Sequence, residues 1–148
     1  MGFSEAVRTV FKWKYATFSG RASRSEYWWS YLFYFLVIVI YFIVFGGLVG
    51  AFSSADGPSS LMIALLVIGG LLMLAAFLPA IAVQVRRFHD RNISGWWYLA
   101  LFIGSFIPYL GVIPGIAILV ISVLRGTEGP NKFGPDPLRP EVRAEVFA

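Results

Sequence analysis

The segment Gln84-Val-Arg-Arg-Phe-His-Asp-Arg-Asn-Ile-Ser-Gly-Trp-Trp97 separates two long apolar runs of the chain. It contains the only histidine, three of the twelve basic residues and two of the five tryptophans. Cations are favoured near a helix C-terminus, and tryptophan is enriched where a helix meets the membrane–water boundary. The segment therefore predicts the end of one membrane helix, a short polar loop and the start of the next helix.

The composition is that of an integral membrane protein. Of the 148 residues, 58% are hydrophobic and 14% are charged, whereas a soluble domain has about a quarter charged residues. The length suits one membrane domain, expected over residues 1–138. The absence of cysteine excludes a disulfide framework, a thiolate metal site and a cysteine nucleophile. The net charge of +4 lies on segments that flank apolar runs, so we expect anionic lipid, not nucleic acid, as its counter-charge.

Two uncharged runs are long enough to cross a bilayer. The 25 residues from Trp28 to Phe52 rise about 37 Å as a helix, more than the ~30 Å of the hydrocarbon core. The run from Leu61 to Val83 is similar, and a polar turn without Lys or Arg separates the two. We expect full transmembrane helices at about 25–52 and 61–87, joined by an outer loop.

The third apolar run, from Trp96 to Leu124, is long for one span and short for two. Pro108, Gly111 and Pro114 interrupt it, which favours two short helices, at about 94–107 and 110–125, joined by a turn. If the run turns back, all twelve basic residues lie on one side; if it crosses once, four lie outside. Because cytoplasmic loops are enriched in Lys and Arg, both termini are expected in the cytoplasm.

Both ends of the chain are expected at the membrane surface. Residues 3–18 predict a short interfacial helix with apolar side chains on one side and Glu5, Arg8 and Lys12 on the other. Ser23 and Glu26 have the spacing of a capping box before the first span. Residues 126–148 form a turn-rich tail whose end is expected to be disordered. The expected interface anchors are tryptophans: Trp28, Trp29, Trp96 and Trp97.

Several short blocks resemble the DUF805 family of small bacterial inner-membrane proteins of unknown function. The blocks run over 20–28, 86–90, 94–97, 108–111 and 129–137, and the resemblance extends from about Trp13 to Pro137. Phe88 stands where the family usually has Leu, and Arg91 where it usually has a small polar residue. The resemblance implies a multi-pass protein of the bacterial plasma (inner) membrane. It brings no substrate, cofactor or catalytic residue.

The candidate site is a charged cluster at the cytoplasmic boundary. Arginine pairs bidentately with carboxylate and phosphate, so the cluster either locks the surface of the fold together or binds an anionic head group. With one histidine, a metal site is not expected, and His89 is expected to be a structural residue, with general acid–base work as the alternative. No cofactor is expected. The members of this cluster are Arg21, Arg24, Glu26, Arg86, Arg87, His89, Asp90 and Arg91.

The expected function is that of a non-enzymatic accessory or interaction protein, whose partners are the bilayer and either a second copy or another membrane protein. A first alternative is binding of anionic lipid head groups or small anions, with or without an enzymatic step. A second alternative is an oligomeric pore or a transporter component. The apolar runs contain no ionisable residue, which argues against ion or proton transport.

Overall fold

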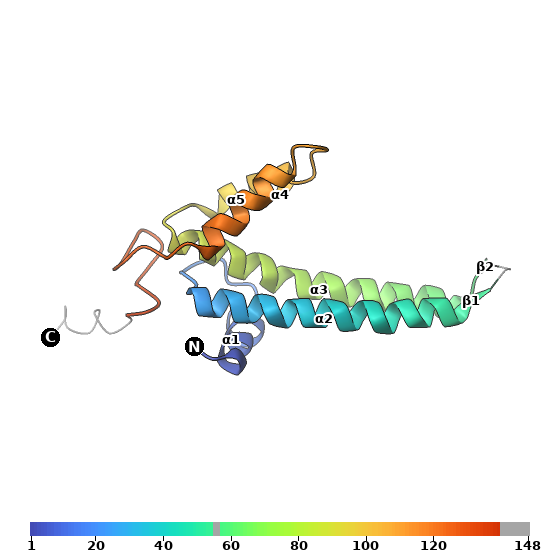
Figure 1. Ribbon diagram of the computed structural model, residues 1–148. Coiled ribbons are helices and arrows are strands. Elements are labelled where there is room, and N and C mark those ends of the chain that lie inside the picture. The colour runs from blue at the N-terminus through green and yellow to red at the C-terminus, as the bar shows by residue number, and fades with distance from the viewer. Residues whose placement is uncertain (55–56, 140–148) are drawn as a thin grey trace.

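A long helical hairpin, with shorter helices packed at one end of it, makes up the computed structural model of the protein (Figure 1). The structure describes residues 1–54 and 57–139. The strands β1 (Ser53–Ser54) and β2 (Gly57–Pro58) pair antiparallel at the tip of the hairpin. In chain order, the helices are α1 (Phe3–Arg8), the π-helix η1 (Thr9–Trp13), α2 (Arg24–Phe52), α3 (Ser60–Asp90), α4 (Gly95–Gly104) and α5 (Val112–Val123).

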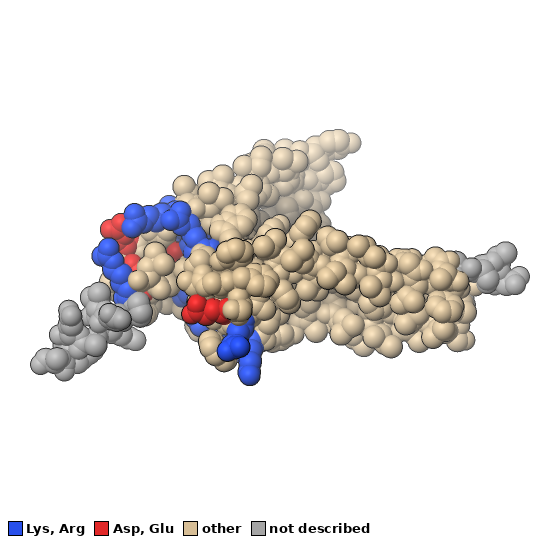
Figure 2. Space-filling view, turned by 60° about the horizontal axis from the view of Figure 1, so that its bottom comes forward, with Lys and Arg blue, Asp and Glu red and all other residues tan. Residues whose placement is uncertain are grey.

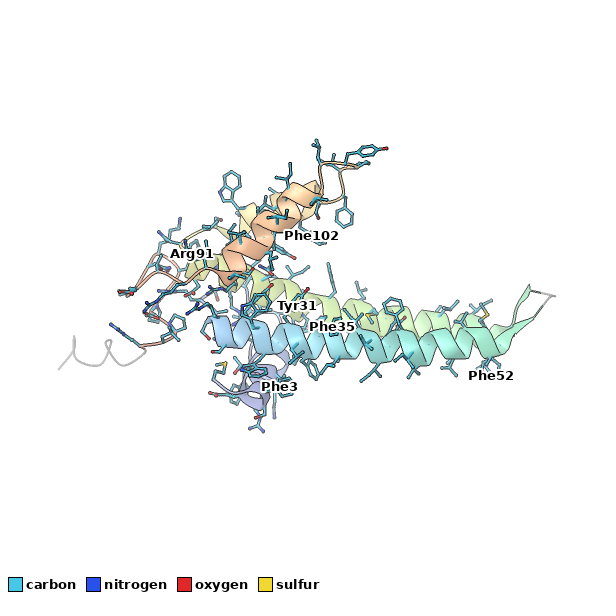
Figure 3. The ribbon with its side chains drawn as sticks, in the orientation of Figure 1. Phe3, Tyr31, Phe35, Phe52, Arg91 and Phe102 are labelled. Atoms are coloured by element: carbon cyan, nitrogen blue, oxygen red, sulfur yellow. The ribbon has the colours of Figure 1, made fainter. Side chains whose placement is uncertain are left out.

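The hairpin helices α2 and α3 are long and apolar enough to cross a membrane. Their 29 and 31 residues correspond to about 44 and 46 Å of helix. Almost none of their apolar windows is buried inside the protein, unlike the core helix of a soluble domain. Phe35 and Phe52 are among the exposed side chains along α2 (Figure 3). This apolar surface needs an apolar surrounding, which a bilayer supplies.

The two long helices approach closely at a glycine of α3. A Cβ on Gly69 would lie 2.8 Å from the Phe45 ring and from the Tyr41 hydroxyl. The Tyr41 and Phe45 rings stack with their centroids 4.6 Å apart, so they form a flat surface over this glycine. By contrast, the α2 glycines that could allow close helix packing, Gly46, Gly47 and Gly50, have open space around them.

The N-terminal helical segment is shorter than the expected 3–18 and ends at Trp13. Lys14 leaves the helical region with φ −125° and ψ 35°, which ends η1. The segment packs on α2 through aromatic pairs: the ring centroids of Phe3 and Trp29 are 5.8 Å apart, and those of Phe11 and Phe33 are 4.9 Å apart. One side of the N-terminal segment therefore packs on the hairpin, and its other side is exposed.

Helices α4 and α5 pack as a short pair at the end of the hairpin where α2 begins (Figure 1). The break between them, residues 105–111, is longer than the expected turn between 94–107 and 110–125, because α4 already ends at Gly104. Pro114 lies in the first turn of α5, where a missing N–H costs little. Gly111 has a steric reason to be glycine: a Cβ there would lie 2.1 Å from the Ser105 carbonyl oxygen. The expected disorder of the chain end falls largely on residues 140–148, which lie outside the described residues.

Candidate functional site

Charged side chains gather at one end of the molecule, and the rest of the described surface in this view is uncharged (Figure 2). We call this region the charged cap and define it by three segments: residues 20–26, 86–94 and 125–139. The cap forms because α4 and α5 return the chain to the end of the hairpin where α2 starts and α3 stops (Figure 1). The three segments are far apart in sequence, yet hydrogen bonds connect them directly.

Asp90 lies at the centre of the charged cap. Its Oδ1 accepts a hydrogen bond from Nε of Arg21 at 2.9 Å and forms an ion pair with Nη2 of Arg21 at 2.9 Å, and its Oδ2 accepts a hydrogen bond from Nη1 of Arg87. All three side chains are at most 4% exposed. Arg87 lies three residues before Asp90 on α3, whereas Arg21 comes from the segment before α2. One carboxylate thus joins α3 to the start of α2.

The same two arginines also donate to backbone carbonyls near the end of α5 and in the tail. Arg21 donates from Nη1 to the Gly129 carbonyl at 2.6 Å and from Nη2 to that of Thr127. Arg87 donates from Nε to the Ser122 carbonyl at 3.0 Å and from Nη2 to that of Leu124. The last carbonyls of a helix have no partner within the helix and carry partial negative charge, so these cations stabilise the end of α5.

A second buried ion pair connects α2 to α3. The Arg86 guanidinium donates from Nη1 to Oε1 of Glu26, and both side chains are at most 3% exposed. Ser23 Oγ accepts from the Glu26 N–H at 3.2 Å, which is one half of the capping box expected from the sequence. The other half is replaced, because the Glu26 carboxylate pairs with Arg86 instead. Nε and Nη2 of Arg86 have no hydrogen-bond partner among the described residues.

Uncharged polar side chains continue these connections toward the apolar part of the protein. The Tyr27 hydroxyl donates to Oε1 of Gln84 at 2.7 Å, and Gln84 Nε2 donates to Ser122 Oγ at 2.9 Å. This chain joins α2, α3 and α5. Sequence reasoning missed it, although a glutamine within an otherwise apolar helix needs buried partners and was therefore a usable signal.

His89 contacts both the segment before α2 and the tail within the charged cap. Its Nδ1 lies 3.1 Å from the Gly20 carbonyl oxygen, which can only accept, so Nδ1 carries a proton. Its ring stacks on Phe133 with the centroids 3.9 Å apart. The Asp90 carboxylate is directed to the arginines, and no carboxylate orients the His89 ring among the described residues. Within the described part of the chain, no group of three metal-ligand side chains occurs.

The remaining predicted cluster members lie at the edge of the charged cap. Arg24 is exposed and has no ion pair among the described residues, and Arg91 donates to the Arg125 carbonyl. Trp28 and Trp29 lie in the first turns of α2, and Trp96 and Trp97 in the first turn of α4. Trp96 is 77% and Trp97 63% exposed. Tryptophans thus lie at both helix starts next to the cap.

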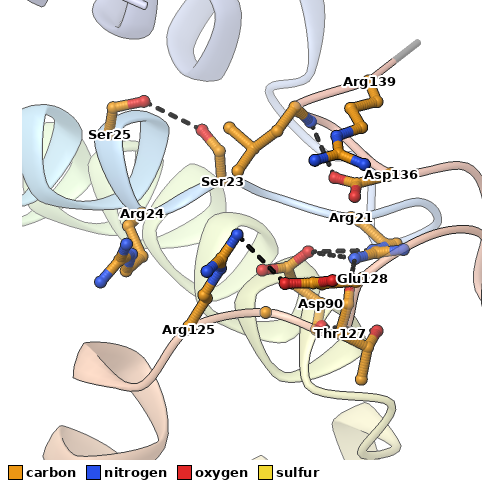
Figure 4. Close-up of a pocket in the computed structure, with 12 residues that line it drawn as sticks. Arg21, Ser23, Arg24, Ser25, Asp90, Arg125, Thr127, Glu128, Asp136 and Arg139 are labelled. Carbon is orange, nitrogen blue, oxygen red and sulfur yellow. Dashed lines mark hydrogen bonds and ion pairs between the residues drawn. The ribbon is translucent and has the colours of Figure 1, made fainter.

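A pocket of about 260 Å³, to whose lining charged residues contribute, opens between the start of α2 and the tail (Figure 4). It was not expected, because the tail contains both acidic and basic residues and reads as neutral. The alternation of arginines and carboxylates in that tail was a feature of the sequence that could have indicated the pocket. The charged residues that line the pocket are Arg21, Arg24, Arg125, Arg139, Asp90, Glu128 and Asp136.

Asp136 is held in place by backbone donors. Its Oδ2 accepts from the Gly129 N–H at 3.2 Å and its Oδ1 from the Leu138 N–H at 2.9 Å. Partial burial alone would raise the pKa of Asp136. The two N–H groups and the charges of Arg21 and Arg139 outweigh burial, so the pKa lies below its usual value of 3.8.

The apolar hairpin and its charged cap define a small helical membrane protein. The chain belongs to the family described as "Protein of unknown function (DUF805)", whose model matches residues 15–135. "Inner membrane protein YhaH" of Escherichia coli (strain K12) is 41% identical over 126 residues, which cover 83% of this chain and 88% of YhaH. "Inner membrane protein YhaI" of the same organism is 35% identical over 123 residues, which cover 83% of this chain and 87% of YhaI. These names state no enzymatic activity, and no solved structure matches the chain.

Proposed function

We propose that this protein is a multi-pass inner-membrane accessory protein whose charged cap faces the cytoplasm and is the surface on which another membrane protein docks. The observation that carries the proposal is that the charged cap contains two kinds of arginine, buried and exposed. Arg21, Arg86 and Arg87 are buried and used in internal contacts, whereas Arg24 and Arg139 are exposed. Within the buried set, Arg21 and Arg87 support a non-catalytic role, because their guanidinium groups donate to the Asp90 carboxylate and to backbone carbonyls.

The arrangement of α4 and α5 supports a hairpin that enters the membrane and returns to the same side. Their 10 and 12 residues correspond to about 15 and 18 Å, too short to cross a core of ~30 Å. Backbone groups in a lipid environment need internal partners. In the turn between the helices, the N–H groups of Ile107, Leu110 and Gly111 all donate to carbonyls of the same turn or of the end of α4.

The N-terminal segment supports an interfacial position next to the charged cap. Its Trp13 side chain is 62% exposed and Lys12 is exposed, while Ala6 and Val10 are fully buried against the hairpin. A helical segment with one packed side and an exposed Trp and Lys suits the head-group layer. The runs Trp28–Phe52 and Leu61–Val83 contain no Asp, Glu, Lys, Arg or His, so the accessory role is favoured over ion or proton transport.

Cysteine labelling tests the orientation, since the natural chain has no cysteine. We would introduce Phe133→Cys in the tail, Ser94→Cys before α4 and Ser54→Cys at the hairpin tip, and treat spheroplasts with a membrane-impermeant maleimide. We expect labelling of the Ser54→Cys protein alone. Labelling of the Phe133→Cys protein in intact spheroplasts would place the tail outside and refute the proposed topology.

Site-specific cross-linking in cells tests the docking role. A photoreactive residue at exposed Arg24 should give a discrete adduct with one membrane protein, whereas the same residue at exposed Ile40, within the span, should not give that adduct. Identical cross-linking patterns at the two positions would refute a docking surface at the charged cap.

A further inference from the structure

We propose that the pocket between the start of α2 and the tail binds a phosphate group, carried by an anionic lipid head group or by free phosphate. The proposed function, in which the charged cap lies at the cytoplasmic membrane surface, bears only on whether the phosphate comes from a lipid or from solution. The pocket is lined by four arginines and three carboxylates, together with hydroxyl groups of Ser23, Ser25 and Thr127. Its volume of about 260 Å³ far exceeds the ~10–15 Å³ that holds one water.

The Asp90 and Asp136 carboxylates in the lining already have partners within the protein. Asp90 is shared between Arg21 and Arg87, and Arg87 lies outside the lining. Asp136 accepts two backbone N–H groups. Positive charge therefore remains in the pocket and is concentrated on the arginines that have no buried acceptor.

Arg24 and Arg139 are the two lining arginines without an ion pair among the described residues, and both are exposed. They come from opposite sides of the pocket, one from the first turn of α2 and the other from the tail (Figure 4). A third, Arg125, forms an ion pair with Glu128 at 3.2 Å, and both side chains are more than 60% exposed. Such exposed pairs contribute little, so Arg125 can exchange its carboxylate for a phosphate at small cost.

Arginine suits this ligand because its planar guanidinium donates two parallel hydrogen bonds to phosphate oxygens. The hydroxyls of Ser23 and Ser25 are hydrogen-bonded to each other at 3.1 Å, which leaves one O–H group as a neutral donor at the same wall. The positive end of the α2 dipole lies at this wall as well and favours an anion there. The phosphate would bridge α2 and the tail, which are otherwise joined through Arg21.

The experiment compares lipid binding to the detergent-solubilised full-length protein by native mass spectrometry. Phosphatidic acid and phosphatidylglycerol would be titrated against phosphatidylcholine, with Arg24→Gln and Arg139→Gln as site variants. Arg8→Gln and Lys132→Gln are matched controls, since each removes one exposed positive charge outside the pocket. We expect each site variant to weaken binding of the anionic lipids about tenfold, as loss of a charge-assisted contact implies, and the controls to bind like the natural protein.

Inorganic phosphate distinguishes the two sources. Displacement of lipid by millimolar phosphate, together with a thermal stabilisation that Arg24→Gln abolishes, would assign the site to free phosphate. Retention of lipid under the same conditions would assign it to a head group. Equal losses in the site and control variants, or unchanged binding in Arg24→Gln and Arg139→Gln, would overturn the proposal. The cysteine labelling described above tests the orientation independently. It can therefore refute the proposed topology without refuting the phosphate site, and the lipid titration can do the reverse.

Discussion

Replacing Asp90 with asparagine is the most direct test of how the charged cap is held together. The side chain keeps its size and loses its charge, while the Asp90 carbonyl still accepts from the Thr127 N–H at 2.8 Å. Arg21 and Arg87 would then face each other without a counter-ion, with side-chain exposures of 1% and 0%. The asparagine amide would also present a donor where the arginines need an acceptor.

The expected cost is about 3–5 kcal/mol, because removal of one partner leaves uncompensated buried charge. A typical folded domain is stable by about 5–15 kcal/mol, so this is a large share of the total. Glu128→Gln is the matched control: it also removes a carboxylate paired with an arginine, but that pair is 64% and 70% exposed. The control should cost less than about 1 kcal/mol.

The assay is reversible unfolding of the purified protein in mixed micelles of increasing denaturing detergent, followed by tryptophan fluorescence. Adding Arg21→Gln to Asp90→Asn should lower the cost below the sum of the two single changes, since one stranded cation is removed. If Asp90→Asn and Glu128→Gln cost the same within about 0.5 kcal/mol, or if the double variant is simply additive, the buried-charge reasoning is refuted.

Three further predictions concern neighbouring residues and use the same unfolding assay. Gly126→Ala should destabilise by about 1–3 kcal/mol, because the new Cβ would lie 2.0 Å from Oδ2 of Asp90, whereas Gly115→Ala, in open space, should not. Phe133→Ala should cost about 0.5–1.5 kcal/mol or more through loss of the ring stacked on His89, and Phe133→Tyr should retain most of that stability. The lowered pKa of Asp136 means that its contribution is present above the usual pKa of 3.8 and is lost as the pH falls through the folded value. Natural protein should therefore lose stability more steeply below pH 3.8 than Asp136→Asn, and parallel curves would contradict this assignment.

Hydropathy alone predicted the helical hairpin well, because a bilayer-spanning helix needs a long uncharged run and few other structures tolerate one. The observed α2 and α3 begin and end within a few residues of the expected 25–52 and 61–87. The N-terminal helix was overestimated, since an amphipathic pattern does not show where a π-helical turn and Lys14 end it. Pro114 lies inside the expected helix 110–125, as observed, but it is not part of the break, because the first turn of a helix tolerates proline.

The charged cap was predictable only where spacing is local. The contact between Arg87 and Asp90 follows from their separation of three residues on one helix. The contact between Arg21 and Asp90 spans 69 residues and depends on how α2 packs on α3. The pocket depends further on the return of the tail through α4 and α5, so the sequence predicted Arg21 and Arg24 as site residues but not their position beside Arg125 and Arg139. The binding role of these residues stays a prediction.

Burial of three arginines in a small apolar protein has a physical explanation at this position. The last carbonyls of α5 have no partners within the helix, and neither do the carbonyls of the non-helical segments before α2 and after α5. Arg21 and Arg87 between them donate to the carbonyls of five residues, Ala22, Ser122, Leu124, Thr127 and Gly129. A lysine has only three donors on a single nitrogen and cannot span several carbonyls in this way. Asp90 and Glu26 then offset part of the charge, so the buried arginines act as rigid connectors of chain segments. Among the described residues, the side chains of Arg24 and Arg139 make no such connections, and for that reason we propose these two exposed arginines, and not the buried ones, as the ligand contacts.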